Sequence, residues 1–225
     1  IVTPSPALAS VIISSYSCAD LSGISIPDAS VSIYRDGKKV KQHSGDILFT
    51  HTGLSGPGIL DSSRYMKPGD VLKIAFLQGD PAVLIKNLTD SLSSAGSRLV
   101  RKVLLSYPLP ERVSRKIVEM AGIDPECTAS HLSRQSRQNL INLLLGCPFT
   151  VRVIGGVNDA MVTSGGVCLD EINPKTMESR IVPGLYFIGE VADVDGDTGG
   201  YNLQAAFSMG TLAAASIQKK WVLQH

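Results

Sequence analysis

The sequence has no long hydrophobic run and few cysteine or aromatic residues. No apolar stretch reaches the roughly 18 residues that a membrane-spanning helix needs, and no signal peptide opens the chain. Its four cysteines are widely spaced without a C-x-x-C pair, which argues against a zinc site or a redox dithiol and favours free, buried thiols. The 44% of hydrophobic and 18% of charged residues are ordinary for a globular chain. We therefore expect a cytoplasmic protein with no membrane partner and no bound metal.

The first eighty residues carry the signals of β-strands. Apolar residues alternate with serines over 30–34, and Asp36-Gly37 supplies a tight hairpin turn. The expected strands are residues 6–14, 30–34, 38–42, 46–50 and 71–77. A short helix, capped by Ser55 or Gly56, is expected to run to about residue 64. Residues 1–80 should therefore form the first part of a small antiparallel β-barrel or sandwich.

The pattern changes at Asp80-Pro81, which is typical of a helix N-cap followed by a proline in the first turn. Helical spacing is found over residues 82–94, 98–107, 111–121 and 134–145. Residues 81–147 are therefore predicted to be a four-helix insertion. Residues 148–158 return to the barrel with a strand over 149–154, and Gly155-Gly156 is the expected hinge to a last region, 159–225.

The predicted insertion is basic, although the whole chain has a net charge of only +1. Residues 81–148 contain nine basic and five acidic side chains, a net charge of +4. The rest of the chain contains 12 basic and 15 acidic side chains, a net charge of −3. Such a face suits an anionic ligand or a nucleic acid, but solvated helix surfaces commonly have this composition. Nucleic-acid binding is therefore the less favoured interpretation.

Residues 184–210 carry the strongest functional pattern. Leu185–Ile188 is an apolar run suited to a central parallel strand, and Gly189-Glu190 follows at its carboxyl end, where open α/β sheets place ligands. Gly199-Gly200 allow the backbone to approach a ligand closely, before a helix whose free N–H groups suit an electron-rich oxygen or a phosphate. The carboxylate of Glu190 is suited to accept hydrogen bonds from sugar hydroxyls. This order of strand, acidic glycine loop and helix is typical of dinucleotide binding.

At these residues the chain resembles the bacterial aminoacetone-oxidase-like NAD(P)/FAD-dependent oxidoreductases, a branch of the glutathione-reductase-like flavoproteins with two dinucleotide-binding domains. The resemblance is carried by GDILFTHTGLSGPGILDSSR (45–64), AMVTSGGVCLDEINPKTMESRIVPGLYFIGEVAD (160–193) and VDGDTGGYNLQAAFSMG (194–210). It implies that FAD carries the redox chemistry and moves a hydride between NAD(P)H and a small organic substrate. It also implies that residues 159–225 are the C-terminal part of a Rossmann-like FAD-binding domain. The expected fold class is therefore mixed, α+β with an α/β portion.

One feature of such flavoproteins is missing. Their FAD-binding domain begins with a strand, a G-x-G-x-x-G turn and a helix, and the sequence contains no such motif. The chain also opens at Ile1-Val2 without a methionine. We therefore expect a fragment whose main partner is the missing N-terminal half of the same protein. Alone, this fragment is expected to lack FAD, to be inactive, and to self-associate through apolar surface over 185–188 and 203–221.

The resemblance also assigns cofactor contacts. Glu190 would hold the ribityl or nearby hydroxyls, and Gly189 would pass the pyrophosphate. The remaining assigned residues are Thr163, Gly165 and Gly166 near the isoalloxazine ring, Gly200, Tyr201 and Asn202 near the pyrimidine end of the flavin, and Asp195 and Gly199 in the same loop. Without the resemblance, Gly165-Gly166 fits a glycine-bent strand crossing equally well.

His51 is the candidate for proton transfer. It ends an expected strand and precedes the helix cap, so a neutral imidazole there could relay a proton to or from a substrate. The commoner role of such a histidine is to form hydrogen bonds at a strand end.

Asp193, Asp195 and Asp197 alternate as the acids of a calcium loop do. The sixth position of that loop would be Thr198 rather than glycine, and the twelfth would be Gln204 rather than glutamate. These acids are therefore interpreted as part of a flavin loop and not as a metal site.

Two other functions stay open at the level of the sequence. The chain could belong to a flavin-dependent enzyme that modifies RNA and docks through the basic helical insertion. It could also be a non-enzymatic domain kept for partner binding. Salt-dependent RNA binding would favour the first of these, because phosphate contacts weaken steeply with salt.

Overall fold

The computed structural model describes residues 1–224 and divides the chain into two compact units. The barrel unit is the continuous segment Val11–Ile154, and the terminal unit combines residues 1–10 with residues 155–224. The barrel unit is therefore inserted between the two parts of the terminal unit. The expected barrel segment 1–80 contributes to both.

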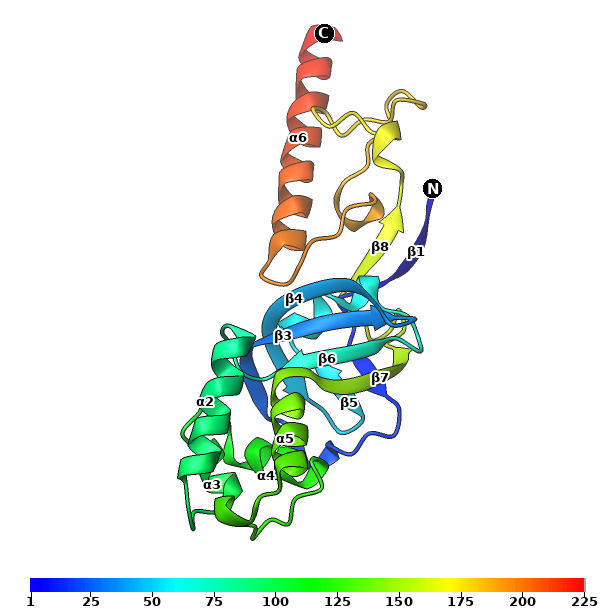
Figure 1. The fold of residues 1–225 in the computed structure, drawn as a ribbon. Helices are drawn as coiled ribbons and strands as arrows, with labels where there is room; N and C mark the ends of the chain where they lie inside the picture. Colours follow the sequence, from blue (N-terminus) through cyan, green and yellow to red (C-terminus); the bar gives the residue numbers. More distant parts are fainter. Residues whose placement is uncertain (225) are drawn as a thin grey trace. The chain divides into compact units, whose positions relative to one another are not determined.

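The barrel unit is built on a closed antiparallel barrel (Figure 1). Its strands are β2 (Val11–Ile13), β3 (Ser25–Arg35), β4 (Lys38–Phe49), β5 (Gly53–Ser55), β6 (Val71–Ala75) and β7 (Cys147–Ile154). They follow the order β2, β5, β4, β3, β6, β7, and β7 closes the barrel by pairing with β2. Of the two architectures that the sequence left open, the structure has the barrel.

Alternate residues of the strands face the barrel interior, as the pattern of the sequence predicts. The fully buried residues of the central strands include Val31, Ile33, Ile47, Phe49, Leu72 and Ile74. The Phe49 ring lies 6.3 Å from the Phe76 ring and 6.5 Å from the Phe149 ring, measured between centroids. Aromatic rings at this separation pack favourably. The intervening residues of the same strands are less buried, and they include the polar residues Ser30, Ser32 and Lys73.

The β3–β4 hairpin turns at Asp36-Gly37, where both residues have positive φ, +50° and +76°. This is the conformation that two-residue hairpin turns favour, and Asp-Gly suits it. The two strands expected over 38–42 and 46–50 are one strand, β4, so that expectation was wrong. Ser44 and Gly45 pair with Ser30 and Ala29 of β3, and this pairing carries the strand across the expected gap.

A pair of glycines lets the short helix α1 (Pro57–Leu60) pack directly on β4. A Cβ atom added to Gly58 would lie 2.7 Å from the carbonyl oxygen of Gly45, and one added to Gly45 would lie 2.9 Å from the nitrogen of Gly58. Both positions therefore exclude any side chain. The helix ends earlier than the expected residue 64, and a 3₁₀ turn, η2 (Ser63–Tyr65), follows it.

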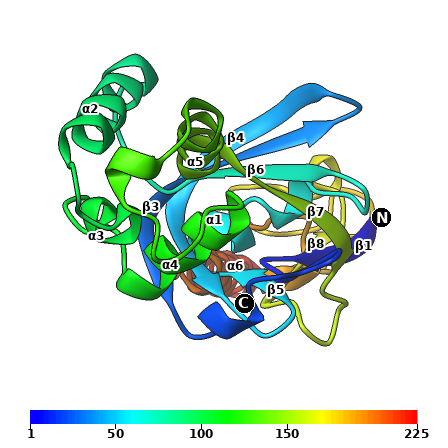
Figure 2. The ribbon, with the colours of Figure 1, turned by 60° about the horizontal axis from the view of Figure 1, so that its bottom comes forward.

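Four helices follow the barrel strand β6 in the sequence: α2 (Pro81–Ser94), α3 (Val100–Leu104), α4 (Glu111–Met120) and α5 (Arg134–Gly146). Figure 2 shows them gathered beside the barrel. The Asp80 carboxylate caps α2 by accepting the N–H groups of Ala82 and Val83 at 2.9 and 3.0 Å. Only α3 is much shorter than expected from the spacing over 98–107.

The helices and the barrel share one hydrophobic core. Leu88 of α2, Leu104 of α3, Val113 of α4 and Leu144 of α5 are fully buried. The backbone N–H of Phe76 also donates to the carbonyl of Leu144 at 3.0 Å. The helical segment is thus packed on the barrel and is part of the same compact unit.

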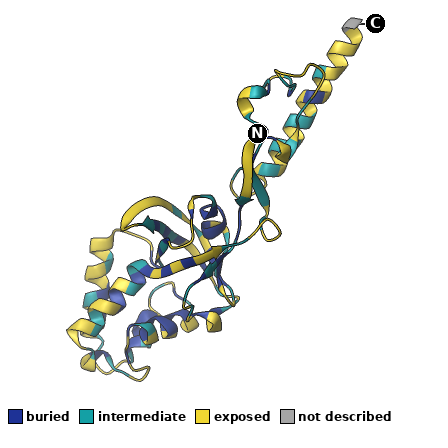
Figure 3. Ribbon diagram, turned by 90° about the vertical axis from the view of Figure 1, so that its right-hand side faces the viewer, coloured by how far each residue is buried: buried dark blue, intermediate teal, exposed yellow. Residues whose placement is uncertain are grey.

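The terminal unit contains a two-stranded antiparallel sheet and one long helix. Strand β1 (Val2–Ala7) pairs with β8 (Val162–Gly166), and the helix is α6 (Tyr201–Gln224). Two 3₁₀ turns, η4 (Leu169–Glu171) and η5 (Gly189–Val191), lie between β8 and α6 in the sequence. Its core is small and comprises Val167, Ile172, Met177, Ala192 and Ala213. Figure 3 accordingly shows α6 largely exposed.

The single strand expected over 6–14 is two strands, β1 and β2, so that expectation was wrong as well. Leu8 has a positive φ of +52° and interrupts the extended chain between them. Alternating sequence patterns do not reveal such a break, because each side of it remains apolar.

The apolar run Leu185–Ile188 is not a strand, which contradicts the expectation of a central parallel strand. Tyr186 forms an isolated antiparallel bridge with Glu178, and the side chains of Leu185 and Ile188 are 42% and 48% exposed. A central strand needs a partner on each side. Within the described residues of the terminal unit, β1 and β8 pair only with each other.

All four cysteines are free. Cys18 and Cys147 are buried, and Cys127 and Cys168 are half-buried. Burial raises the pKa of the Cys147 thiol to about 12, so this thiol stays protonated at neutral pH. Among the described helices, none combines the length and the apolar character that a membrane crossing requires.

Candidate functional site

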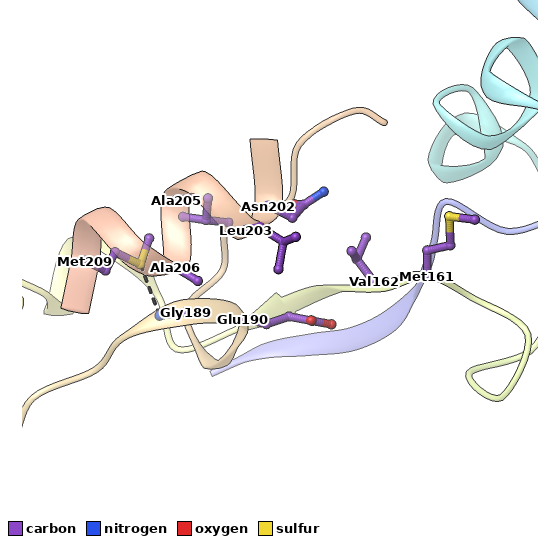
Figure 4. Close-up of a pocket in the computed structure, with 10 residues that line it drawn as sticks. Met161, Val162, Gly189, Glu190, Asn202, Leu203, Ala205, Ala206 and Met209 are labelled. Carbon is purple, nitrogen blue, oxygen red and sulfur yellow. Dashed lines mark hydrogen bonds between the residues drawn. The ribbon is translucent and has the colours of Figure 1, made fainter. Parts of the chain in front are cut away.

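The terminal unit contains a cavity of about 340 Å³ between β8, η5 and α6 (Figure 4). It is lined by Met161, Val162, Gly189, Glu190, Val194, Asn202, Leu203, Ala205, Ala206 and Met209. Ligand cavities commonly measure about 300 to 1,000 Å³, so this one is at the small end of the range. Its walls are mainly apolar, and Glu190 is the only charged residue among them.

The Glu190 carboxylate is held by the sheet. Its Oε1 atom accepts a hydrogen bond of 2.5 Å from the backbone N–H of Thr163 in β8. Thr163 in turn pairs with Pro6 of β1, so the sheet fixes the position of the donor. No hydrogen bond of the other carboxylate oxygen occurs within the described part of the chain. That oxygen is available to accept a hydrogen bond from a hydroxyl group of a ligand.

Gly189 begins the turn η5 and contacts the helix α6. Its φ is +73°, a conformation that favours glycine, and its N–H donates to Met209 Sδ at 3.3 Å (dashed in Figure 4). A Cβ atom added at this position would lie 3.6 Å from the side chain of Ala206. The backbone of Gly189 thus forms one wall of the cavity, against the helix.

Asn202 fastens the loop that precedes α6. Its Oδ1 atom accepts the N–H of Gly196 at 2.8 Å, and its Nδ2 atom donates to the carbonyl of the same residue at 3.1 Å. Gly199 and Gly200 of this loop have positive φ values of +111° and +88°. Tyr201, the first residue of α6, is 65% exposed. The roles of these residues in cofactor binding stay predictions.

The Gly165-Gly166 pair approaches the protein's own backbone. A Cβ atom on Gly165 would lie 2.5 Å from the carbonyl oxygen of Thr3, and one on Gly166 would lie 2.5 Å from that of Val191. Both residues also have positive φ, +91° and +130°. Internal packing therefore explains both glycines without a ligand, and their contact with a flavin stays a prediction.

The remaining predicted residues lie elsewhere. His51 belongs to the barrel unit, where it is exposed in the turn between β4 and β5. Asp195 is half-buried in the loop that Asn202 fastens. Within the described residues, no three His, Cys, Asp or Glu side chains are grouped so that they could hold a metal ion. The catalytic role proposed for His51 stays a prediction.

The cavity suits the hydroxyl-bearing part of FAD better than its pyrophosphate. One carboxylate can accept a hydrogen bond from a sugar hydroxyl, and the apolar walls can contact an adjoining ring. No Lys or Arg is among the lining residues, so the charge of a phosphate would depend on the positive end of α6. A cavity of about 340 Å³ therefore fits one portion of a dinucleotide.

One face of α6 carries large apolar side chains in contact with solvent. Leu203, Phe207, Ile217 and Trp221 are 67%, 72%, 48% and 65% exposed. Their spacing of three to four residues, or multiples of it, places them along one side of the helix. Apolar surface over residues 203–221 is expected from the sequence, and these four side chains provide it.

The apolar lining of the cavity was not predicted from the sequence. Met161 precedes β8, Val162 begins it, and Ala206 and Met209 come from α6. Met161 is 67% exposed, a property that the sequence does not reveal. The one signal in the sequence for an apolar cavity was the presence of small residues, Ala205 and Ala206, beside the larger apolar residues Leu203 and Met209 in the first turns of α6.

Comparison with known proteins identifies the family. The model of the HI0933-like protein barrel and H2TH domain matches residues 5–162. A ribosomal RNA dihydrouridine synthase of Escherichia coli is 36% identical over 197 residues, which cover 88% of this chain and 47% of the relative. The enzyme of that name from Haemophilus influenzae is 34% identical over 200 residues, which cover 89% and 48%.

A third relative has a different substrate in its name. The 3-dehydro-bile acid delta(4,6)-reductase of Clostridium scindens is 27% identical over 221 residues, which cover 96% of this chain and 54% of the relative. The chain thus spans about half the length of the curated relatives it matches. It belongs to the HI0933-like barrel and H2TH domain family, within the FAD-dependent oxidoreductase superfamily.

Proposed function

We propose that this chain is part of a flavin-dependent reductase that acts on uracil bases of ribosomal RNA. The two relatives named for this reaction are 36% and 34% identical and cover nearly nine tenths of the chain. The relative named a bile-acid reductase covers 96% of the chain at 27% identity. The first pair favours RNA as the substrate over a small molecule.

Both names describe related chemistry. Conversion of uridine to dihydrouridine adds two hydrogens across a carbon–carbon double bond conjugated with a carbonyl group. A delta(4,6)-reductase acting on a 3-dehydro steroid saturates a double bond conjugated in the same way. Reduced FAD, when bound, supplies the hydride for such a reaction. Substrate choice then depends on the protein surfaces outside the reacting centre.

The single observation that supports a cofactor role for the terminal unit is the Glu190 carboxylate. It is held by the Thr163 N–H at the edge of an apolar cavity, and one of its oxygens remains available. We infer that this oxygen accepts a ribityl hydroxyl of FAD. The terminal unit would then be the C-terminal half of a Rossmann-like FAD-binding domain, and the other half of the relatives' length would supply the pyrophosphate turn.

The charges of the two units support an RNA substrate. The barrel unit has 17 basic and 12 acidic residues, a net charge of +5, whereas the terminal unit has four basic and eight acidic, a net charge of −4. A positive unit attracts the phosphate backbone of RNA, and it offers no such advantage for a small neutral substrate.

The test is the dihydrouridine content of ribosomal RNA. The gene is deleted, ribosomal RNA is digested to nucleosides, and dihydrouridine is measured by mass spectrometry. Dihydrouridine should fall on deletion and return when the full-length gene is restored, but not when the gene carries Glu190→Ala. Asp170→Ala, which removes an exposed carboxylate outside the cavity, is the matched control and should restore it. Unchanged dihydrouridine after deletion would contradict the proposal.

A second candidate is the reduction of a small conjugated ketone with NAD(P)H, which the bile-acid reductase favours because its match covers 96% of the chain. The purified full-length protein would then oxidise NADH or NADPH when a 3-oxo-4,6-diene steroid is added. Turnover of such a ketone together with unchanged ribosomal RNA would select this candidate.

A further inference from the structure

A polar groove lies on the outside of the barrel. It has a volume of about 440 Å³ and is formed by the outer face of β4, β3 and β6 together with the start of α2 and the end of α5. Its polar lining consists of Ser30, Ser32, Tyr34, Lys39, Gln42, Ser44, Lys73 and Gln78. We call these residues the barrel groove.

The strand register brings these side chains together. Ser32 of β3 pairs with Gln42 of β4 on one side and with Lys73 of β6 on the other. Tyr34, two residues along β3, pairs with Lys39. Because alternate residues face the same side of a sheet, hydroxyl, amide and ammonium groups form one continuous outer surface.

The groove is positively charged and has no compensating carboxylate. No Asp or Glu is among its lining residues. Lys39 Nζ donates to Gln42 Oε1 at 2.8 Å, and Lys73 Nζ lies 4.6 Å from the centre of the Tyr34 ring. Neither lysine forms an ion pair within the described residues. Three other cations of the barrel unit do form ion pairs: Arg35 with Asp70, Arg101 with Glu126 and Lys116 with Glu119.

We propose that the barrel groove binds the phosphodiester backbone of a single RNA strand. Lysines bind phosphate oxygens, and serine hydroxyls and glutamine amides can bind phosphate oxygens or ribose 2′-hydroxyls. None of these groups needs a particular base, so the groove positions the strand and does not read its sequence. The proposal rests on the proposed function, since it names the surface that holds the RNA substrate.

The test is the binding of a labelled single-stranded RNA, a segment of ribosomal RNA about 20 nucleotides long, to the 225-residue chain at several salt concentrations. The variant Lys39→Ala/Lys73→Ala should weaken binding by about tenfold or more, as expected for two lost charged contacts. The slope of log K against log salt should become shallower by about 1.4, because each phosphate contact on single strands contributes about 0.7.

The matched control is Lys86→Ala/Lys102→Ala. It removes the same charge from exposed positions on α2 and α3, outside the groove. This pair should bind RNA within about twofold of the unchanged chain. Equal losses in the two double variants would show attraction by overall charge and would overturn the proposal. So would unchanged binding by the groove variant with its melting temperature preserved.

Inorganic phosphate and uridine monophosphate serve as competitors. If either competitor displaces the RNA at concentrations close to the dissociation constant of the RNA, the groove is a site for a free phosphate. That result would overturn the assignment to an RNA strand. The dihydrouridine measurement on ribosomal RNA is independent of these results. If the gene restores dihydrouridine but the groove variant binds RNA normally, only the groove assignment fails. If deletion leaves dihydrouridine unchanged, the proposed function fails whatever the groove binds.

Discussion

The backbone N–H of Thr163 donates a 2.5 Å hydrogen bond to the Oε1 atom of Glu190, which lies 27 residues further along the chain. This bond joins strand β8 to the turn η5, two elements that line the same cavity. It fixes one carboxylate oxygen of a side chain that lines the cavity. The side chain is therefore placed for binding before any ligand arrives.

Replacing Glu190 by Ala in the full-length protein should weaken FAD binding. Hydrogen bonds to charged groups contribute about 1.5 to 3 kcal/mol, which corresponds to roughly 10- to 150-fold in affinity. Glu190→Gln keeps an acceptor for the Thr163 N–H and should have a smaller effect. Flavin content after purification and titration of the apoprotein with FAD measure both variants. Equal FAD affinity in Glu190→Ala and the unchanged protein would refute the assignment.

Gly165→Ala should destabilise the pairing of β1 with β8. The added Cβ atom would meet the Thr3 carbonyl at 2.5 Å, and φ is +91°, so we expect a loss of about 1 to 3 kcal/mol. Hydrogen exchange of the amides of β1 and β8 should accelerate. Gly156→Ala is the control, because nothing lies within 4 Å of a Cβ atom there. Similar exchange in both variants would show that the close approach is not important.

The exposed stripe of α6 should cause self-association of the 225-residue chain. Light scattering should show a mass that grows with concentration, because large apolar side chains in water favour association. Phe207→Ser/Trp221→Ser should reduce it, whereas Val83→Ser/Leu105→Ser, at exposed positions of the barrel unit, should not. We also expect no yellow colour after addition of FAD. A monomer loaded stoichiometrically with FAD would contradict both expectations.

The ion pair of Asp70 with Arg35 should make stability depend on pH. Burial alone favours the neutral form of Asp70, but hydrogen bonds from Arg35 at 2.8 and 2.9 Å and from the Lys67 N–H lower the pKa of the carboxyl below its usual value. The pKa is thus lower in the folded state than in the unfolded state. The stabilisation is fully present above about pH 4 and is lost as the pH falls through the folded pKa.

Asp70→Asn should remove this dependence and lower the free energy of unfolding at pH 7 by about 1 to 3 kcal/mol. Asp36→Asn is the control, since Asp36 is exposed and asparagine tolerates its positive φ. Urea unfolding between pH 3 and pH 7 measures both variants. A pH profile of Asp70→Asn that matches the unchanged chain would exclude this role.

Local signals predicted much of the barrel unit. Asp80 followed by Pro81 marks the start of α2, and Asp36-Gly37 marks the β3–β4 turn, because in each case neighbouring residues determine the conformation. The end of α1 at Leu60 was missed because it depends on packing against β4. Alternation predicted an antiparallel barrel or sandwich without deciding between them, because the closure of the barrel by β2 and β7 joins segments far apart in the sequence.

The terminal unit was less predictable. The run Leu185–Ile188 is apolar enough for a strand, but a strand also needs partners, and no local pattern encodes them. Glu190 was identified as a candidate from its place after a glycine, whereas its hydrogen bond with Thr163 depends on the position of β8. The ion pair of Lys220 with Glu178, 42 residues apart, was missed for the same reason.

The pairing of β1 with β8 also constrains the timing of folding during synthesis. Ribosomes add about 5 to 20 residues per second, so the residues between the two strands, 8–161, take about 8 to 31 s to appear. The barrel unit is continuous and can fold within that interval, and its ends already meet through the pairing of Val11 with Ile154. Strand β1 has no partner until then. A nascent chain therefore exposes an unpaired strand edge for many seconds, during which chaperones or neighbouring nascent chains can bind it.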